Sequence, residues 1–143
     1  MSRISLINIT LGFFLLVITG FMGVFSSFTL TEAFLKGRDV VPHWEEVLFA
    51  AAHGHLGLFA ILHIVLGLTF PYARSSFFVK KLQSLGVFMG CVAMGPLLVL
   101  RGILGPADSF SPLGLVIGGF MSLSMAALLS HGVCLLSKLR ERY

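Results

Sequence analysis

The stretch from Ile4 to Leu30, ISLINITLGFFLLVITGFMGVFSSFTL, contains no charged side chain. A helix needs about 20 mainly apolar residues to cross the hydrocarbon core of a bilayer, and this stretch is longer than that. Because lipid offers the backbone no hydrogen-bond partner, we expect the stretch to cross as an α-helix. Arg3 precedes it, as in a secretory signal peptide, but no Ala-x-Ala cleavage site follows, so we expect the helix to be retained.

Three further stretches have the same character, at residues 47–70, 77–100 and 112–137. Of the 143 residues, 57% are hydrophobic and 11% are charged, whereas soluble domains carry about 25% charged residues. That leaves too little polar surface to cover a globule in water. The expected fold class is therefore all-α: a single transmembrane domain, residues 1–143, in which helices at about 4–30, 47–70, 77–100 and 112–137 form an integral membrane four-helix bundle.

The distribution of basic residues predicts the orientation. Short cytoplasmic loops are enriched in Lys and Arg. Only Lys36, Arg38 and Arg101 lie in the first and third loops. The N-terminus, the second loop and the C-terminus carry the other seven basic residues, which are Arg3, Arg74, Lys80, Lys81, Lys138, Arg140 and Arg142. We therefore expect both termini on the cytoplasmic side. The expected location is the inner membrane of a bacterium.

Two functional classes are disfavoured. The net charge of +4 falls between apolar runs rather than in a basic patch interleaved with aromatic residues, so we expect no nucleic-acid partner. There is no Gly-x-Ser-x-Gly sequence, no Walker loop and no Gly-x-Gly-x-x-Gly sequence between a strand and a helix. We expect no enzymatic activity from this chain alone.

Small residues predict close helix packing. Gly86 and Gly90 in the third span, and Gly114 and Gly118 in the fourth, form Gly-x-x-x-Gly patterns that let helix backbones approach one another. The patterns do not identify the partner helix. The expected partners are the lipid bilayer and, through these Gly-x-x-x-Gly faces, either other membrane subunits or further copies of this chain.

Histidines inside the second and fourth spans are the candidate functional residues, because ionisable side chains are uncommon in a bilayer. His53 and His55 lie about 160° apart around the second helix, with His63 between them, so the three cannot share one ligand. A cofactor would need a ligand from another helix. His63 and His131 lie about 24 Å and 28 Å below the outer ends of their spans, which predicts that they could hold a b-type haem, with His55 as an alternative ligand.

A second candidate cluster lies at the outer end of the second span. Glu46 precedes His53 by two turns on the same face, and His43 is close in sequence. These three residues could form a metal site at the outer surface. They could also admit protons to a relay that continues to His63, because a nearby carboxylate favours a protonated imidazole.

The segment Ala52–Phe59, AHGHLGLF, continuing to HIVLG at 63–67, resembles the histidine-rich helices of haem-copper oxidase catalytic subunits and of small four-helix membrane proteins related to them. In that family such histidines bind haem iron or copper. The resemblance implies that His53 or His55 is an axial ligand. The chain has too few helices for a complete oxidase subunit, and the second histidine pair of a copper site is absent.

Two hypotheses of different classes follow. In the first, the protein binds b-type haem or a metal through intramembrane histidines and serves electron transfer or the assembly of a respiratory complex. In the second, it is a non-catalytic accessory subunit, or a small transporter with a proton relay. In the accessory subunit the histidines are structural, and each neutral imidazole donates a hydrogen bond to a neighbouring carbonyl or side chain.

Overall fold

The computed structural model describes residues 1–37, 44–106 and 111–140, except for the side chains of Leu30 and Leu139. The first two spans are α1 (Arg3–Leu35) and α2 (Trp44–Thr69). The third consists of α3 (Phe77–Val92), the π-helical turn η1 (Ala93–Leu97) and α4 (Leu98–Ile103), and the fourth is α5 (Pro112–Leu139). All four are long and apolar enough to cross a membrane. The all-α prediction is therefore confirmed for the described residues, and the predicted spans match the observed helices to within five residues at each end.

Serine side chains begin three of these helices. The hydroxyl oxygens of Ser2, Ser76 and Ser111 each accept a hydrogen bond from the backbone amide three residues later. Such capping satisfies one of the amides that a helix start leaves without an intrahelical partner. In α5 the next residue is Pro112, whose missing N–H is not needed at that position. The helix starts are therefore encoded locally.

The third span is not a regular α-helix. Pro96 lies inside it and has no N–H to donate, and residues Ala93–Leu97 widen into a π-helical turn. The helix then resumes as α4 in the same span. Gly95, in the widened turn, packs against Leu56 of α2, and a Cβ added to this glycine would lie 3.0 Å from the Leu56 side chain. The sequence predicts an uninterrupted α-helix at 77–100, and the structure differs from this prediction in the π-helical turn around Pro96.

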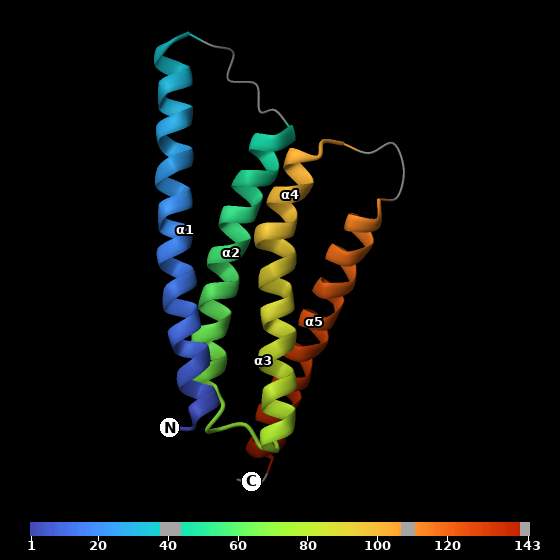
Figure 1. The fold of residues 1–143 in the computed structure, drawn as a ribbon. Helices are drawn as coiled ribbons and strands as arrows, with labels where there is room; N and C mark the ends of the chain where they lie inside the picture. The colour runs from blue at the N-terminus through green and yellow to red at the C-terminus, as the bar shows by residue number, and fades with distance from the viewer. Residues whose placement is uncertain (38–43, 107–110, 141–143) are drawn as a thin grey trace.

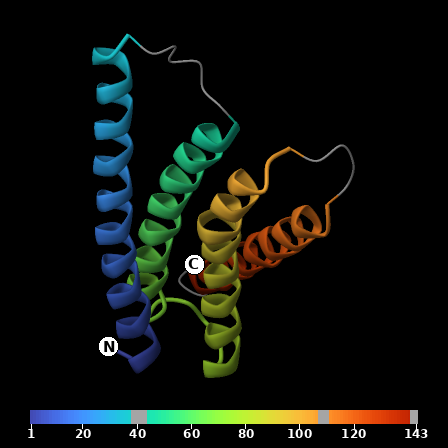
Figure 2. The same cartoon turned by 45° about the horizontal axis from the view of Figure 1, so that its top comes forward.

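The helices are arranged as an open row rather than a closed bundle. In Figures 1 and 2 the order across the molecule is α1, α2, the third span and α5. The principal contacts join neighbours in this row: α1 packs on α2, α2 on α3 and α4, and α3 on α5. Within the described ranges α1 and α5 do not touch. The four predicted helices therefore form an arrangement that is open at its edges, because the first and last helices flank the row.

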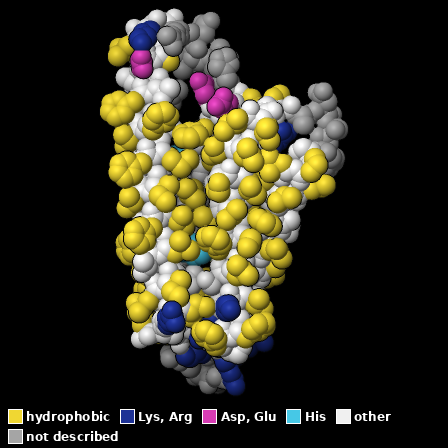
Figure 3. Space-filling model, in the orientation of Figure 1, with side chains coloured by type: hydrophobic (Ala, Val, Ile, Leu, Met, Phe, Trp, Pro, Cys, Tyr) yellow, Lys and Arg dark blue, Asp and Glu magenta, His cyan; other side chains and the backbone are white. Residues whose placement is uncertain are grey.

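Both termini lie at the same end of the molecule, as an even number of antiparallel spans requires (Figure 1). On the face drawn in Figure 3, hydrophobic side chains cover the middle of the molecule. Acidic side chains appear on that face only at the end away from the termini, whereas most basic side chains lie near the termini. This banding is typical of a protein whose middle contacts lipid and whose ends contact water.

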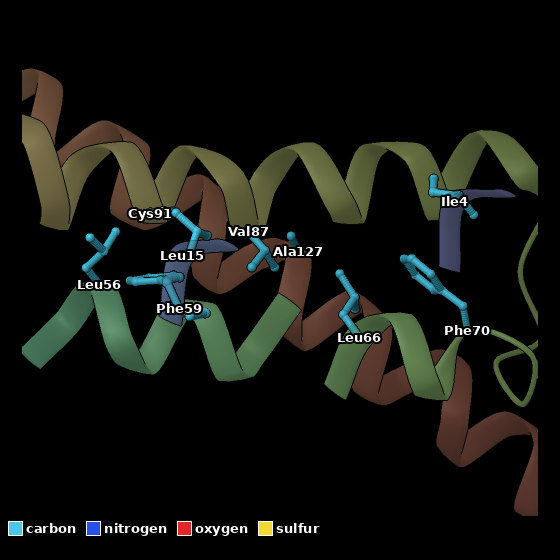
Figure 4. Close-up of a cluster of buried hydrophobic side chains, with 10 residues drawn as sticks. Ile4, Leu15, Leu56, Phe59, Leu66, Phe70, Val87, Cys91 and Ala127 are labelled. Carbon is cyan, nitrogen blue, oxygen red and sulfur yellow. The ribbon is translucent and has the colours of Figure 1, made fainter. Parts of the chain in front are cut away.

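The core lies along α2, the helix that contacts both α1 and the third span. In Figure 4, Leu56 and Phe59 of α2 point toward Val87 and Cys91 of α3, and all four are buried. Glycines let the helices approach closely. A Cβ added to Gly12 of α1 would lie 2.6 Å from a backbone oxygen of α2, too close for any real side chain.

The fourth span is the least buried. Only 6% of the most hydrophobic stretch of α5 lies inside the protein, against 28–33% for the other spans. The two Gly-x-x-x-Gly patterns consequently have different environments. Gly86 and Gly90 are covered by Ala127 and Phe59, whereas Gly118 meets no neighbouring atom and Gly114 meets only the hydroxyl of its own cap, Ser111. The outward face of α5 is therefore left to lipid or to another protein.

Candidate functional site

A polar cluster connects α1, α2 and α3 inside the apolar core. The ring nitrogen Nδ1 of His63 lies 2.8 Å from Oδ1 of Asn8, and the hydroxyl of Ser84 donates to the same oxygen at 3.0 Å. His63 and Asn8 have no exposed surface. The amide nitrogen of Asn8 donates to the carbonyl of Ile4 at 2.8 Å, which orients the Asn8 side chain. One asparagine thus joins three helices.

This arrangement determines where His63 carries its proton. Oδ1 of Asn8 can only accept, so Nδ1 of His63 is the donor. In the neutral imidazole the other nitrogen, Nε2, then has a free lone pair. Nε2 is buried and has no hydrogen-bond partner among the described residues. The ring of Phe88 lies edge-on to the imidazole, with its centroid 6.4 Å away. His63 therefore offers one buried acceptor in an otherwise apolar setting.

A second polar cluster connects α2, α3 and α5 through His131. Nδ1 of His131 lies 3.2 Å from Oε1 of Gln83, and Nε2 lies 2.8 Å from the hydroxyl of Thr69. The Gln83 amide nitrogen donates to Ser130 at 3.1 Å, so its oxygen faces the imidazole. The oxygen of Gln83 can only accept, so Nδ1 of His131 is the donor to it. Nε2 lies beside the Thr69 hydroxyl, which is also 2.7 Å from the carbonyl oxygen of Val65. Both nitrogens of His131 are therefore used within the protein.

The structure gives His63 and His131 separate surroundings. His131 lies opposite Thr69, which follows His63 by six residues on α2, a rise of about 9 Å along the helix. Within the described part of the chain no hydrogen bond or ring contact joins the two imidazoles. His131 instead packs edge-on against Phe70, with ring centroids 5.4 Å apart. The sequence predicts that His63 and His131 lie at similar depths and could share a ligand. In the structure they belong to two separate polar clusters.

The remaining predicted ligands lie toward the N-terminal half of α2. His55 is anchored to its own helix, with Nδ1 2.7 Å from the carbonyl oxygen of Ala51. His53 contacts Gly23 of α1, and its Nδ1 is buried without a hydrogen-bond partner among the described residues. His43 lies outside the described residues. Among the residues that are described, no three His, Cys, Asp or Glu side chains come together as a metal site, so the structure does not join Glu46 and His53 in such a group.

A further contact joins α2 and α4 at the end of the molecule away from the termini (Figure 1). The indole nitrogen of Trp44 donates to the backbone oxygen of Arg101 at 3.4 Å, and the guanidinium carbon lies 5.5 Å from the indole centroid. Arg101 also donates to the backbone oxygen of Gly105. The charged end of Arg101 is thus held at this end of the molecule by an aromatic ring, a geometry of the cation–π kind.

Four polar residues that the sequence analysis did not single out hold the histidines: Asn8, Thr69, Gln83 and Ser84. A signal for two of them was present. The chain contains one Asn and one Gln, and both lie within apolar spans. A carboxamide in lipid is costly without a partner, which marks such a residue as a contact between helices.

Comparisons of the chain with protein-family models, with characterised proteins and with solved structures find no match, so the assignment of function depends on the geometry above.

Proposed function

We propose that the protein is a non-catalytic accessory subunit of a membrane assembly, in which buried histidines hold the spans together. The observation that supports this most directly is His131. Its two ring nitrogens form hydrogen bonds with Thr69 of α2 and Gln83 of α3, so the imidazole of α5 bridges two other helices. An imidazole whose two nitrogens both contact protein groups has no open position for iron.

The exposed flank of the row supports the same proposal. The α5 face turned away from α3 carries small residues at every fourth position, all of them exposed: Gly114, Gly118, Ser122 and Ala126. Small residues on an unpacked transmembrane face allow another helix to approach closely. The partner is another membrane subunit or a second copy of this chain.

The orientation belongs to the proposal as well. The end that holds both termini carries most of the basic residues, and we place it in the cytoplasm by the positive-inside rule. The membrane is then the cytoplasmic membrane of a bacterium. The polar clusters of His63 and His131 lie in the half of the protein nearer this side, and the contact between Trp44 and Arg101 lies at the outer surface.

Purification in a mild detergent tests the proposal. The 15.5 kDa chain, carrying an affinity tag, should migrate on native electrophoresis with other membrane proteins or as an oligomer. Leucine at Gly118 should release it, because the larger side chain blocks the small-residue face. A chain that always migrates as a folded monomer would refute the accessory role.

His63 supports a second candidate function, the binding of a b-type haem or a metal. Its Nδ1 is fixed by Asn8, and its Nε2 is free of hydrogen bonds among the described residues. Metal-ligating histidines commonly show this arrangement, in which one nitrogen donates to an oxygen and the other binds the metal. Such a cofactor would link the protein to electron transfer or to respiratory-complex assembly.

Absorption spectroscopy and metal analysis distinguish the two candidates. A haem protein shows a Soret band, and substitution of His63 by Ala should remove it, whereas the matched substitution of His53 should not. A colourless preparation without bound metal, obtained from cells supplied with iron and haem precursor, would refute the second candidate and leave the first intact.

A further inference from the structure

Two lysines without an acidic partner lie at the start of α3. Lys80 and Lys81 belong to its first two turns, Lys81 exposed and Lys80 half-buried, and the first turn contains no acidic residue. Neither lysine forms an ion pair with a residue that the structure describes, unlike Lys36, which pairs with Glu32 at the opposite end of the molecule. The two positive charges are therefore left to water or to an external anion.

The neighbouring helix adds further positive charge. Gln83 of α3 donates to Ser130 of α5, so the end of α5 runs beside the start of α3. Lys138 lies in the last turn of α5, and Arg140 follows it. The described acidic residues are all at the other end of the molecule (Figure 3), and Glu141 lies outside the described residues. The two lysines thus belong to a surface with an excess of positive charge.

Exposed apolar side chains adjoin the lysines. Phe77 and Phe78 begin α3 and are 68% and 66% exposed, and Leu82 and Leu85 are about half exposed further along the same helix. The third span is long and apolar enough to cross a membrane, so such side chains are suited to contact with lipid. Positive charge at the end of an exposed apolar helix face suits a ligand with an anionic head and an apolar tail.

We propose that the start of α3 binds an anionic phospholipid, with its phosphate at Lys80 and Lys81 and its acyl chains along the exposed apolar side chains of α3. The two lysines point about 100° apart around the helix, and their flexible four-carbon stems let both ammonium groups reach one phosphate. Basic residues next to a membrane span attract anionic lipids in this way. The surface is separate from the His63 and His131 clusters and does not depend on the accessory role.

Charge and exposure together distinguish this ligand from two simpler ones. A neutral lipid would cover Phe77 and Phe78 but leave the lysines without a counter-charge. A soluble anion would pair with the lysines but leave both aromatic rings uncovered. An anionic phospholipid satisfies both parts of the surface.

Native mass spectrometry of the full chain in a neutral detergent tests the proposal. The protein is mixed with equal concentrations of phosphatidylglycerol and phosphatidylcholine that carry the same acyl chains, so that the two lipids differ only in the headgroup. We expect phosphatidylglycerol to bind about tenfold more tightly. The preference should fall as the concentration of ammonium acetate is raised, because salt screens exposed charges.

Two double variants form a matched pair. Lys80→Gln with Lys81→Gln removes two positive charges from the start of α3, and Lys36→Gln with Arg38→Gln removes two from the other end of the protein. Arg38 lies outside the described residues. The net charge changes equally in both variants, and circular dichroism verifies that both fold. We expect the first variant to lose most of the preference for phosphatidylglycerol and the second to retain it.

Three results would overturn the proposal. Equal binding of the two lipids by the wild type would leave the surface to water or to another protein. An unchanged preference in the variant with Lys80→Gln and Lys81→Gln would place the lipid elsewhere on the protein. Displacement of phosphatidylglycerol by inorganic phosphate, but not by acetate at the same ionic strength, would show that the lysines select a free anion.

Discussion

At the scale of single residues, the buried imidazoles are stabilised by side chains from other helices. His63 donates through Nδ1 to Asn8, which also accepts from Ser84, so one carboxamide oxygen joins an imidazole and a hydroxyl in the core. In lipid such contacts are worth less than their burial suggests, because the separated helices also find partners. The strength of the contact between Asn8 and His63 is therefore best measured as a coupling free energy.

A double-mutant cycle measures that coupling. We expect Asn8→Ala and His63→Ala each to destabilise the protein and the double variant to lose less than the sum. The coupling free energy should be about 0.6 kcal/mol and not exceed about 1.7 kcal/mol, the range found for hydrogen bonds between membrane helices. Reversible unfolding in mixed micelles provides the measurement. Strict additivity would contradict the contact between Asn8 and His63.

The His131 cluster supports a second prediction at this scale. Leucine in place of Gln83 removes the acceptor from Nδ1 of His131 and the donor to Ser130. The imidazole N–H is then buried without a partner, a loss of about 1–3 kcal/mol in unfolding free energy. Thr29→Val is the matched control, because its exposed hydroxyl bonds only to its own helix. Equal unfolding curves for Gln83→Leu and the wild type would remove His131 from its bridging role.

At the scale of helices, close approach depends on particular glycines rather than on glycine content. A Cβ on Gly86 would lie 2.5 Å from Cβ of Ala127, so the substitution Gly86→Ala must push α3 and α5 apart. The same change at Gly54 meets open space and removes a residue of low helix propensity. We expect Gly86→Ala to destabilise by about 1–3 kcal/mol and Gly54→Ala to stabilise by at most about 1 kcal/mol. Thermal unfolding in detergent followed by circular dichroism compares the two, and effects of the same sign would contradict the packing.

Sequence patterns predicted the helices better than the contacts between them. Hydropathy depends on composition, so the four spans and the start at Pro112 could be predicted without knowledge of neighbours. The π-helical turn was not predicted, because a widened turn does not change the hydropathy of the apolar run that contains Pro96. The partners of His63 and His131 depend on how each helix is rotated and on the relative height of neighbouring helices. A helix that is apolar on all sides carries no sequence signal for either quantity.

At the scale of the whole molecule, the open row could not be predicted for the same reason. Four apolar helices are compatible with a closed bundle and with a row, because lipid can cover any face that protein does not. The row leaves α1 and α5 as separate flanks (Figure 1). This makes the orientation in the membrane and the occupant of the α5 face the two decisive questions about the assembly.

Cysteine labelling tests the orientation. In a background with Cys91 replaced by Ala and Cys134 by Ser, single cysteines at Tyr72 and at Pro106 report on opposite ends of the row, since both positions are exposed. In right-side-out vesicles, a membrane-impermeant maleimide should label the cysteine at 106 and reach the cysteine at 72 only after the vesicles are lysed. The reverse pattern would invert the proposed orientation. None of these substitutions changes a charged residue, so the charges on which the orientation depends stay in place.

The exposed face of α5 gives the last prediction. Leucine at Gly118 fills the small-residue face without touching the rest of the chain, because a Cβ there meets no atom within 4 Å. If that face contacts another helix, the substitution should lower the association constant by about tenfold or more, equivalent to about 1.4 kcal/mol. Gly54→Leu adds the same side chain to an exposed position on α2 and should leave association unchanged. Energy transfer between labelled chains in vesicles measures self-association, and co-purification measures binding to other subunits. Because the two variants differ only in the helix that is widened, equal association in both would mean that lipid, and not protein, covers α5.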